Sequence, residues 1–181
     1  MSDVICMRGA LCATALSMFV AAMAGPALAQ DKNTAIKEAL AAAPPALAAL
    51  ATVQDWEGNV LREGGGEFVC LPRTPDSEVV NSMCLDKPWL AWAKAWMNKE
   101  PVRIDTVGTA YMLAGDGGAS NIDPFAKEKT ADNQWVVEGP HLMIVVPDTA
   151  ALDGMPTDPK NGGPYVMWKG TPYAHIMAPL D

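Results

Sequence analysis

The two histidines are the residues best suited to chemistry in this chain, and each stands two positions before a methionine. The motifs are His141-Leu-Met143 and His175-Ile-Met177, each inside a short apolar run. Residues two apart in a strand point to the same side, so each imidazole shares a face with a thioether. Imidazole and thioether ligands suit Cu(I), so the motifs predict a copper or other metal site with four ligands. The alternative is that both runs are core strands, because methionine fills protein cores readily.

The second motif belongs to a predicted hairpin at the end of the chain. A four-residue loop there pairs Trp168 with Tyr173 across the two strands. The face that bears His175 and Met177 then also carries Trp168 and Tyr173, which form a predicted ligand platform. Met167 points to the opposite side in this register. Whether His141 and Met143 share the same face depends on strand order.

A glycine-rich polar loop from 114 to 124 is a second candidate site. Its side-chain oxygens suit a hard cation such as calcium. These oxygens belong to Asp116, Ser120, Asn121 and Asp123. The spacing does not match an EF-hand, and the loop lacks the third glycine of a dinucleotide-binding fingerprint. A turn-rich surface loop is the alternative.

Sequence signatures of hydrolases are absent from the chain. It contains no G-x-S-x-G motif, and no residues stand out as catalytic. A small hydrolase or lyase that uses His141 or His175 as a base remains one alternative function. No cofactor is indicated.

The first 29 residues have the pattern of a signal peptide. Arg8 precedes an apolar run from 10 to 24, and Ala27-Leu-Ala29 supplies small residues for cleavage. The apolar run is too short to span a bilayer comfortably. We therefore expect a periplasmic or secreted protein whose mature form has no membrane segment. Cys70 and Cys84 remain after cleavage, and an even number in an oxidising compartment predicts a disulfide.

The chain is acidic, and its charges are dispersed. It has 13 Lys and Arg against 21 Asp and Glu, which gives a formal net charge of −8. Without a basic patch, nucleic acid and anionic membrane surfaces are poor partners. A small ligand or a protein partner remains.

Two segments make up the rest of the chain after the signal peptide. Residues 30–51 are alanine-rich and predict a helical arm or linker, and residues 52–181 are long enough for one globular domain. Within that domain, the glycines at 64–66 predict a β-hairpin between flanking apolar runs.

The strongest predicted helix begins after Asp86 and ends before Pro101. Asp86 is suited to cap its first turn, and Trp89, Trp92 and Trp96 lie on one face. Such a stripe could stack sugars, but it is more typical of a helix that packs on a sheet. The expected fold is α+β, with a mostly antiparallel sheet of about six strands and this Trp-rich helix on one face.

Several short motifs are similar to a known group. They are Met83-Cys-Leu-Asp86, Asn121-Ile-Asp-Pro124, Gly139-Pro-His-Leu-Met143 and the stretch from Tyr165 to His175. From about residue 52 to the C-terminus the chain resembles uncharacterised exported bacterial proteins. The resemblance implies one compact exported domain and carries no activity. The favoured function is non-enzymatic binding of a small ligand or partner. The alternatives are a copper or other metal-binding protein and a small hydrolase or lyase.

Overall fold

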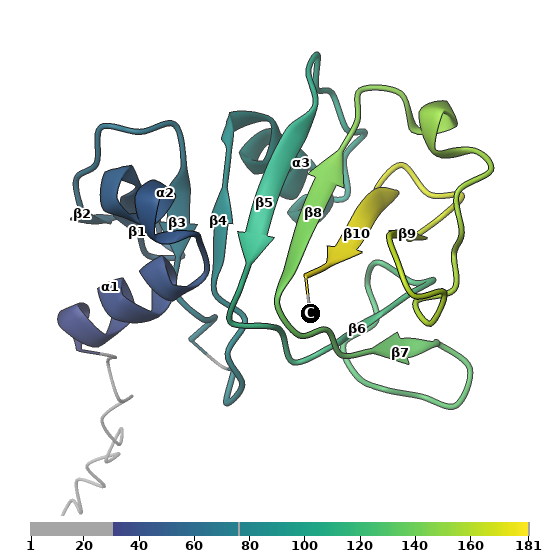
Figure 1. Ribbon diagram of the computed structural model, residues 1–181, viewed down its shortest axis with the longest axis horizontal. Coiled ribbons are helices and arrows are strands. Elements are labelled where there is room, and N and C mark those ends of the chain that lie inside the picture. Colours follow the sequence, from purple (N-terminus) through teal and green to yellow (C-terminus); the bar gives the residue numbers. More distant parts are fainter. Residues whose placement is uncertain (1–30, 76, 181) are drawn as a thin grey trace, which may run out of the picture.

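An eight-stranded sheet forms the centre of the computed structural model, which describes residues 31–75 and 77–180 (Figure 1). The predicted signal peptide lies outside the described residues. Strand order is β2-β1-β3-β4-β5-β8-β10-β9, and neighbours are antiparallel except β1 and β3. The expected α+β fold with a mostly antiparallel sheet is confirmed, with eight strands in the main sheet rather than about six.

The helices and strands have the following bounds. The helices are α1 (Lys32–Ala41), α2 (Pro45–Leu50), α3 (Lys87–Met97) and the short 3-10 helix η1 (Thr149–Leu152). The main-sheet strands are β1 (Thr52–Gln54), β2 (Val60–Arg62), β3 (Val69–Leu71), β4 (Met83–Leu85), β5 (Gly108–Met112), β8 (His141–Val145), β9 (Tyr165–Met167) and β10 (His175–Pro179). Strands β6 (Ala119–Ser120) and β7 (Trp135–Val136) form a separate two-stranded sheet. No helix in the described part of the chain combines the length and the apolar character that crossing a membrane requires.

The predicted hairpin around the three glycines is wrong. Strand β1 lies between β2 and β3, so β2 and β3 do not pair with each other. The glycines instead allow the chain to pass the end of α2. A Cβ on Gly64 would lie 2.3 Å from the carbonyl carbon of Ala51, and the N–H of Gly66 donates to the carbonyl of Leu50. Close backbone approach therefore explains Gly64 and Gly66 better than a hairpin turn.

The alanine-rich helices α1 and α2 pack on the sheet. Figure 1 shows them in front of β1 and β3, whereas α3 passes behind β4 and β5. Ala39, Ala42 and Ala51 are fully buried in a cluster with Val53 of β1. Small side chains let the helix backbones approach the sheet closely. The predicted helix is thus present, and the boundary drawn at residue 52 falls inside a packed unit.

The predicted disulfide is confirmed. Cys70 of β3 and Cys84 of β4 are directly opposite each other, and their sulfurs are 2.00 Å apart. Both residues are fully buried beneath α1 and α2, in the cluster that contains Ala39. The bridge joins the two strands that flank the loop 72–82.

Helix α3 also begins where the sequence predicts. The Asp86 side chain accepts a hydrogen bond from the Trp89 N–H, and its second oxygen accepts from the N–H and hydroxyl of Thr109 in β5. Trp89 and Trp92 are buried against the sheet, and Trp96 is half-buried. Asp86 therefore starts the helix and ties it to the sheet that it covers.

Strand β9 forms one edge of the main sheet, and other segments cover that edge. The N–H of Val166 donates to the carbonyl of Pro156, and the N–H of Trp168 donates to the carbonyl of Asn121. Neither of these two N–H groups donates to β10. The edge is therefore closed by two loops.

We expect loss of the disulfide to lower the free energy of unfolding by about 3 kcal/mol, since the bridged residues are 14 apart in sequence. The test is urea denaturation of the Cys70→Ala/Cys84→Ala variant. Reduced wild-type protein is the matched comparison and should give the same midpoint. Equal midpoints for oxidised wild type and the double variant would contradict the expectation.

We expect Asp86→Ala to destabilise the fold by about 2 kcal/mol, because the helix loses its cap and Thr109 loses its acceptor. Asp86→Asn keeps one acceptor oxygen and should cost less. Urea denaturation followed by circular dichroism measures both variants. A loss below about 0.5 kcal/mol for Asp86→Ala would show that the cap is unimportant.

Candidate functional site

A cavity of about 440 Å³ lies between α3 and the face of the sheet that α3 covers. Trp89, Trp92 and Trp96 of α3 line one side. The floor consists of His175 and five methionines on β4, β5, β8, β9 and β10, namely Met83, Met112, Met143, Met167 and Met177. The glycine-rich loop and the segment 77–81 complete the walls. The cavity thus brings together residues of the His-x-Met motifs, the Trp-rich helix and the glycine-rich loop, which the sequence predicts as separate features.

Side chains alternate between the two faces of each strand, so every second residue of β8, β9 and β10 faces the side of the sheet on which the cavity lies. Met143 of β8 lies opposite Met177 of β10, and His175 of β10 lies opposite Met167 of β9. Odd-numbered positions of these strands face α3. Met143, Met167 and Met177 belong to the same buried core cluster as Trp89 and Trp92 of α3. The predicted sharing of a face between each His and its Met therefore holds in both motifs.

The predicted hairpin register is wrong by one residue. His175 pairs with Met167, so Met167 shares the face of His175 and Met177 instead of pointing away. The connection is longer than four residues because β9 ends at Met167 and β10 begins at His175. Trp168 turns out of the strand with a φ of 57°, and its indole N–H donates to the Ser120 carbonyl at 2.6 Å. This tertiary contact ends the strand pairing early.

The two histidines share a face but are not cross-strand neighbours. His141 lies opposite Pro179, which is four residues beyond His175 on β10. At about 3.3 Å per residue this offset is about 13 Å along the strands. The Met143–Met177 pair lies between them. One metal ion with bonds of about 2 Å would not reach both imidazoles across this offset.

Each histidine is held in the same way. Nδ1 of His175 is 3.0 Å from the Tyr173 carbonyl, and Nδ1 of His141 is 2.7 Å from the Gly139 carbonyl. A carbonyl only accepts, so Nδ1 of each ring carries a proton, and Nε2 carries a free lone pair when the ring is neutral. Nε2 of His141 is buried without a hydrogen-bond partner. His175 makes no second hydrogen bond with the described residues.

His175 is neutral at pH 7. Burial lowers its pKa to about 4, partly opposed by the hydrogen bond to the Tyr173 carbonyl, and electrostatic repulsion from His141 contributes least in the lowering direction. The imidazole is 2% exposed. Its lone pair is therefore available over the whole neutral and mildly acidic range.

Indole rings surround His175. The ring centroids of Trp168, Trp92 and Trp89 lie 4.9, 5.2 and 5.5 Å from the imidazole centroid, all nearly perpendicular to it. Trp92 also stacks on Trp168 with an interplanar angle of 4°. These rings separate His175 from bulk water and leave it facing the cavity.

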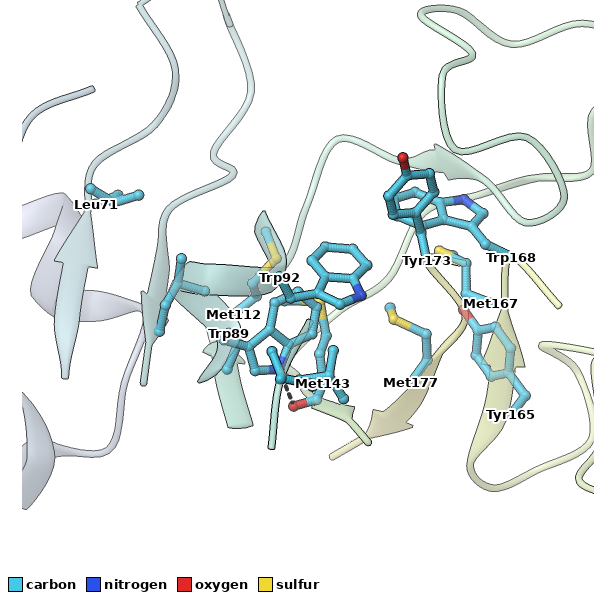
Figure 2. Close-up of a cluster of buried hydrophobic side chains, with 14 residues drawn as sticks. Leu71, Trp89, Trp92, Met112, Met143, Tyr165, Met167, Trp168, Tyr173 and Met177 are labelled. Atoms are coloured by element: carbon cyan, nitrogen blue, oxygen red, sulfur yellow. Dashed lines mark hydrogen bonds between the residues drawn. The ribbon is translucent and has the colours of Figure 1, made fainter. Parts of the chain in front are cut away.

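Three cavity tryptophans anchor the walls through their indole N–H groups. Trp89 donates to the Met143 carbonyl, drawn as a dashed line in Figure 2, and Trp96 and Trp168 donate to carbonyls of the glycine-rich loop and its flank. Trp92 differs, because its Nε1 is buried with no partner. Figure 2 shows this nitrogen on the side of the ring that faces Met177. Trp92 therefore has one unpartnered donor beside the cavity, and His175 has one free acceptor.

The predicted ligand platform is divided by the structure. Trp168 lines the cavity, whereas Tyr173 is not among the residues that line it. The Tyr173 ring lies edge-on to Trp92 at 6.2 Å, and its hydroxyl donates to the Glu100 carbonyl. Tyr173 therefore supports the end of α3.

The glycine-rich loop uses its polar side chains to hold its own shape. The predicted cation ligands are Asp116, Ser120, Asn121 and Asp123, and each makes hydrogen bonds. Asp116 accepts from the backbone N–H groups of Gly118 and Glu138, and Ser120 donates to the Asn133 carbonyl. Among the described residues no group of three or more His, Cys, Asp or Glu is placed to hold a metal ion. Methionine is not one of these residue types, so this absence does not concern thioether ligands.

We expect the His175 imidazole to make stability depend on pH. It titrates near 6.5 in the unfolded chain and near 4 in the folded protein, so between these values the extra proton favours unfolding. Its stabilisation is complete above pH 6.5 and falls by about 3 kcal/mol as the pH falls to 4. Urea denaturation of wild type and His175→Gln at both pH values tests this. Equal losses in the two proteins would contradict the assignment.

Comparisons of the chain with protein-family models, curated proteins and solved structures found no significant match. Function therefore has to be argued from the site. The geometry offers an apolar cavity with aromatic walls, a methionine-rich floor, one unpartnered indole N–H and one imidazole lone pair.

Proposed function

We propose that this chain is an exported, non-enzymatic binding protein whose small ligand occupies the cavity between α3 and the sheet. One observation carries the proposal. Five of the six tryptophans, all in described residues, line a single cavity of about 440 Å³ together with His175. This volume falls in the range of ordinary ligand sites, which are mainly apolar with a few polar groups.

The walls favour a ligand that suits an apolar, polarisable surface. Indole rings and thioethers provide this surface, and the charged residues that line the cavity are Asp116, Asp123 and Lys127 of the glycine-rich loop and its continuation. The unpartnered Trp92 N–H would donate to the ligand, and Nε2 of His175 would accept from it or bind it. A buried donor without a partner is costly, so a ligand that satisfied it would gain affinity.

Binding is better supported than catalysis. A histidine that acts as a general base needs a partner that orients it and stabilises its positive charge, usually a carboxylate. Both imidazoles are oriented by backbone carbonyls of the described residues. Burial also keeps His175 neutral, with a pKa well below the range in which a base exchanges protons at neutral pH.

Export is supported by two independent features. The first 29 residues have the pattern of a signal peptide, and Cys70 and Cys84 form a disulfide, as is common outside the cytosol. The resemblance to exported bacterial proteins has the same implication. We therefore propose a periplasmic or secreted location.

We expect a neutral apolar probe such as N-phenyl-1-naphthylamine to bind saturably at one site per chain and to accept energy from the cavity tryptophans. Ala93→Leu inserts side-chain volume into the cavity from α3 and should weaken binding about tenfold. Ala91→Leu is the matched control, because Ala91 is exposed on the same helix. Fluorescence titration measures all three proteins. Absence of saturable binding to wild type, or equal affinities for both variants, would overturn the proposal.

A further inference from the structure

We propose that the ligand of this cavity is a soft monovalent cation, Cu(I), bound by Nε2 of His175 and the thioethers of Met143, Met167 and Met177. The inference rests on the proposed function, because the ion would occupy the same cavity. It differs from the four-ligand site expected from the sequence in one respect. Met167 replaces His141, which lies about 13 Å further along the strands.

The strand register places the four side chains around one point of the floor. Met143 and Met177 are a direct cross-strand pair, and so are Met167 and His175. His175 and Met177 are also two apart on β10. Opposite Cβ atoms in such pairs are about 5 Å apart, and the three flexible bonds of each methionine allow its sulfur to adjust. All four residues line the cavity. Figure 2 shows the sulfurs of Met167 and Met177 on the side of the sheet where Trp92 and Trp168 lie.

His175 is prepared to act as a ligand. A histidine that binds a metal normally donates its other N–H to a carbonyl or carboxylate, which fixes the ring and its tautomer. The Tyr173 carbonyl accepts in this way from Nδ1 of His175. Nε2 is then the free nitrogen, on a ring that is 2% exposed and lines the cavity.

The ligand set selects for Cu(I) by its softness and its lack of charge. Thioether and imidazole donors favour Cu(I) over hard cations, which require carboxylate, carbonyl or water oxygens. A set of four neutral ligands also suits a single positive charge better than a double one. The indoles of Trp92 and Trp168 add aromatic faces close to His175 that attract a cation and exclude water.

The test is an anaerobic titration of the purified, untagged protein with Cu(I), using bicinchoninate as a competing chelator. We expect one Cu(I) per chain, and X-ray absorption should show both sulfur and nitrogen neighbours. Met177→Leu preserves the side-chain volume and should weaken Cu(I) binding by at least about tenfold. Met97→Leu is the matched control, since Met97 is exposed at the end of α3, and it should bind as wild type does.

Two results would overturn the assignment. One is the absence of stoichiometric Cu(I) binding to folded wild-type protein. The other is equal Cu(I) affinity in Met177→Leu, Met167→Leu and Met97→Leu. In both cases saturable binding of the apolar probe would leave the proposed binding function intact, whereas failure of the probe as well would remove both. Competition between Cu(I) and the probe would support the two proposals together.

Discussion

The register of β10 against β8 and β9 determines which side chains face the cavity. A slip of β10 by one residue would turn His175 and Met177 to the other face of the sheet and bring Ile176 in their place. Trp168 holds that register, because its backbone N–H and its indole N–H both donate to the segment that contains Ser120 and Asn121. Strand pairing and the wall of the cavity therefore depend on the same two hydrogen bonds.

Unsatisfied polar groups are concentrated around this part of the core. Nε2 of His141, Nε1 of Trp92 and Oδ1 of Asn121 are all buried without a partner in the described structure. Each such group costs about 1–3 kcal/mol relative to a satisfied one. The opposite side of the sheet, under α1 and α2, is packed with alanine and crossed by the Cys70–Cys84 bridge. The fold thus combines a strongly stabilised half with a half that retains free bonding capacity.

Local patterns predicted the elements, whereas long-range contacts decided the site. The Asp86 cap follows from residue type, the disulfide from the number of cysteines in an exported chain, and the shared face of each His-x-Met motif from spacing. The register of the last hairpin did not, because Trp168 adopts a left-handed conformation that its contact with Ser120 stabilises. The role of Gly64 depends on a backbone crossing at Ala51, and the cavity requires α3, the sheet and two loops to meet. None of these contacts leaves a periodic signal in the sequence.

The closed edge of β9 limits how the cavity can open. Asn121, whose carbonyl accepts from Trp168 at this edge, adjoins the loop that walls the cavity. A ligand that entered by displacing this loop would leave the backbone N–H of Trp168, directly after β9, free to pair with a strand of another molecule. Admission through that wall would therefore favour aggregation between copies of the chain. Entry past the 77–81 segment carries no such penalty, because that segment pairs with no strand of the sheet.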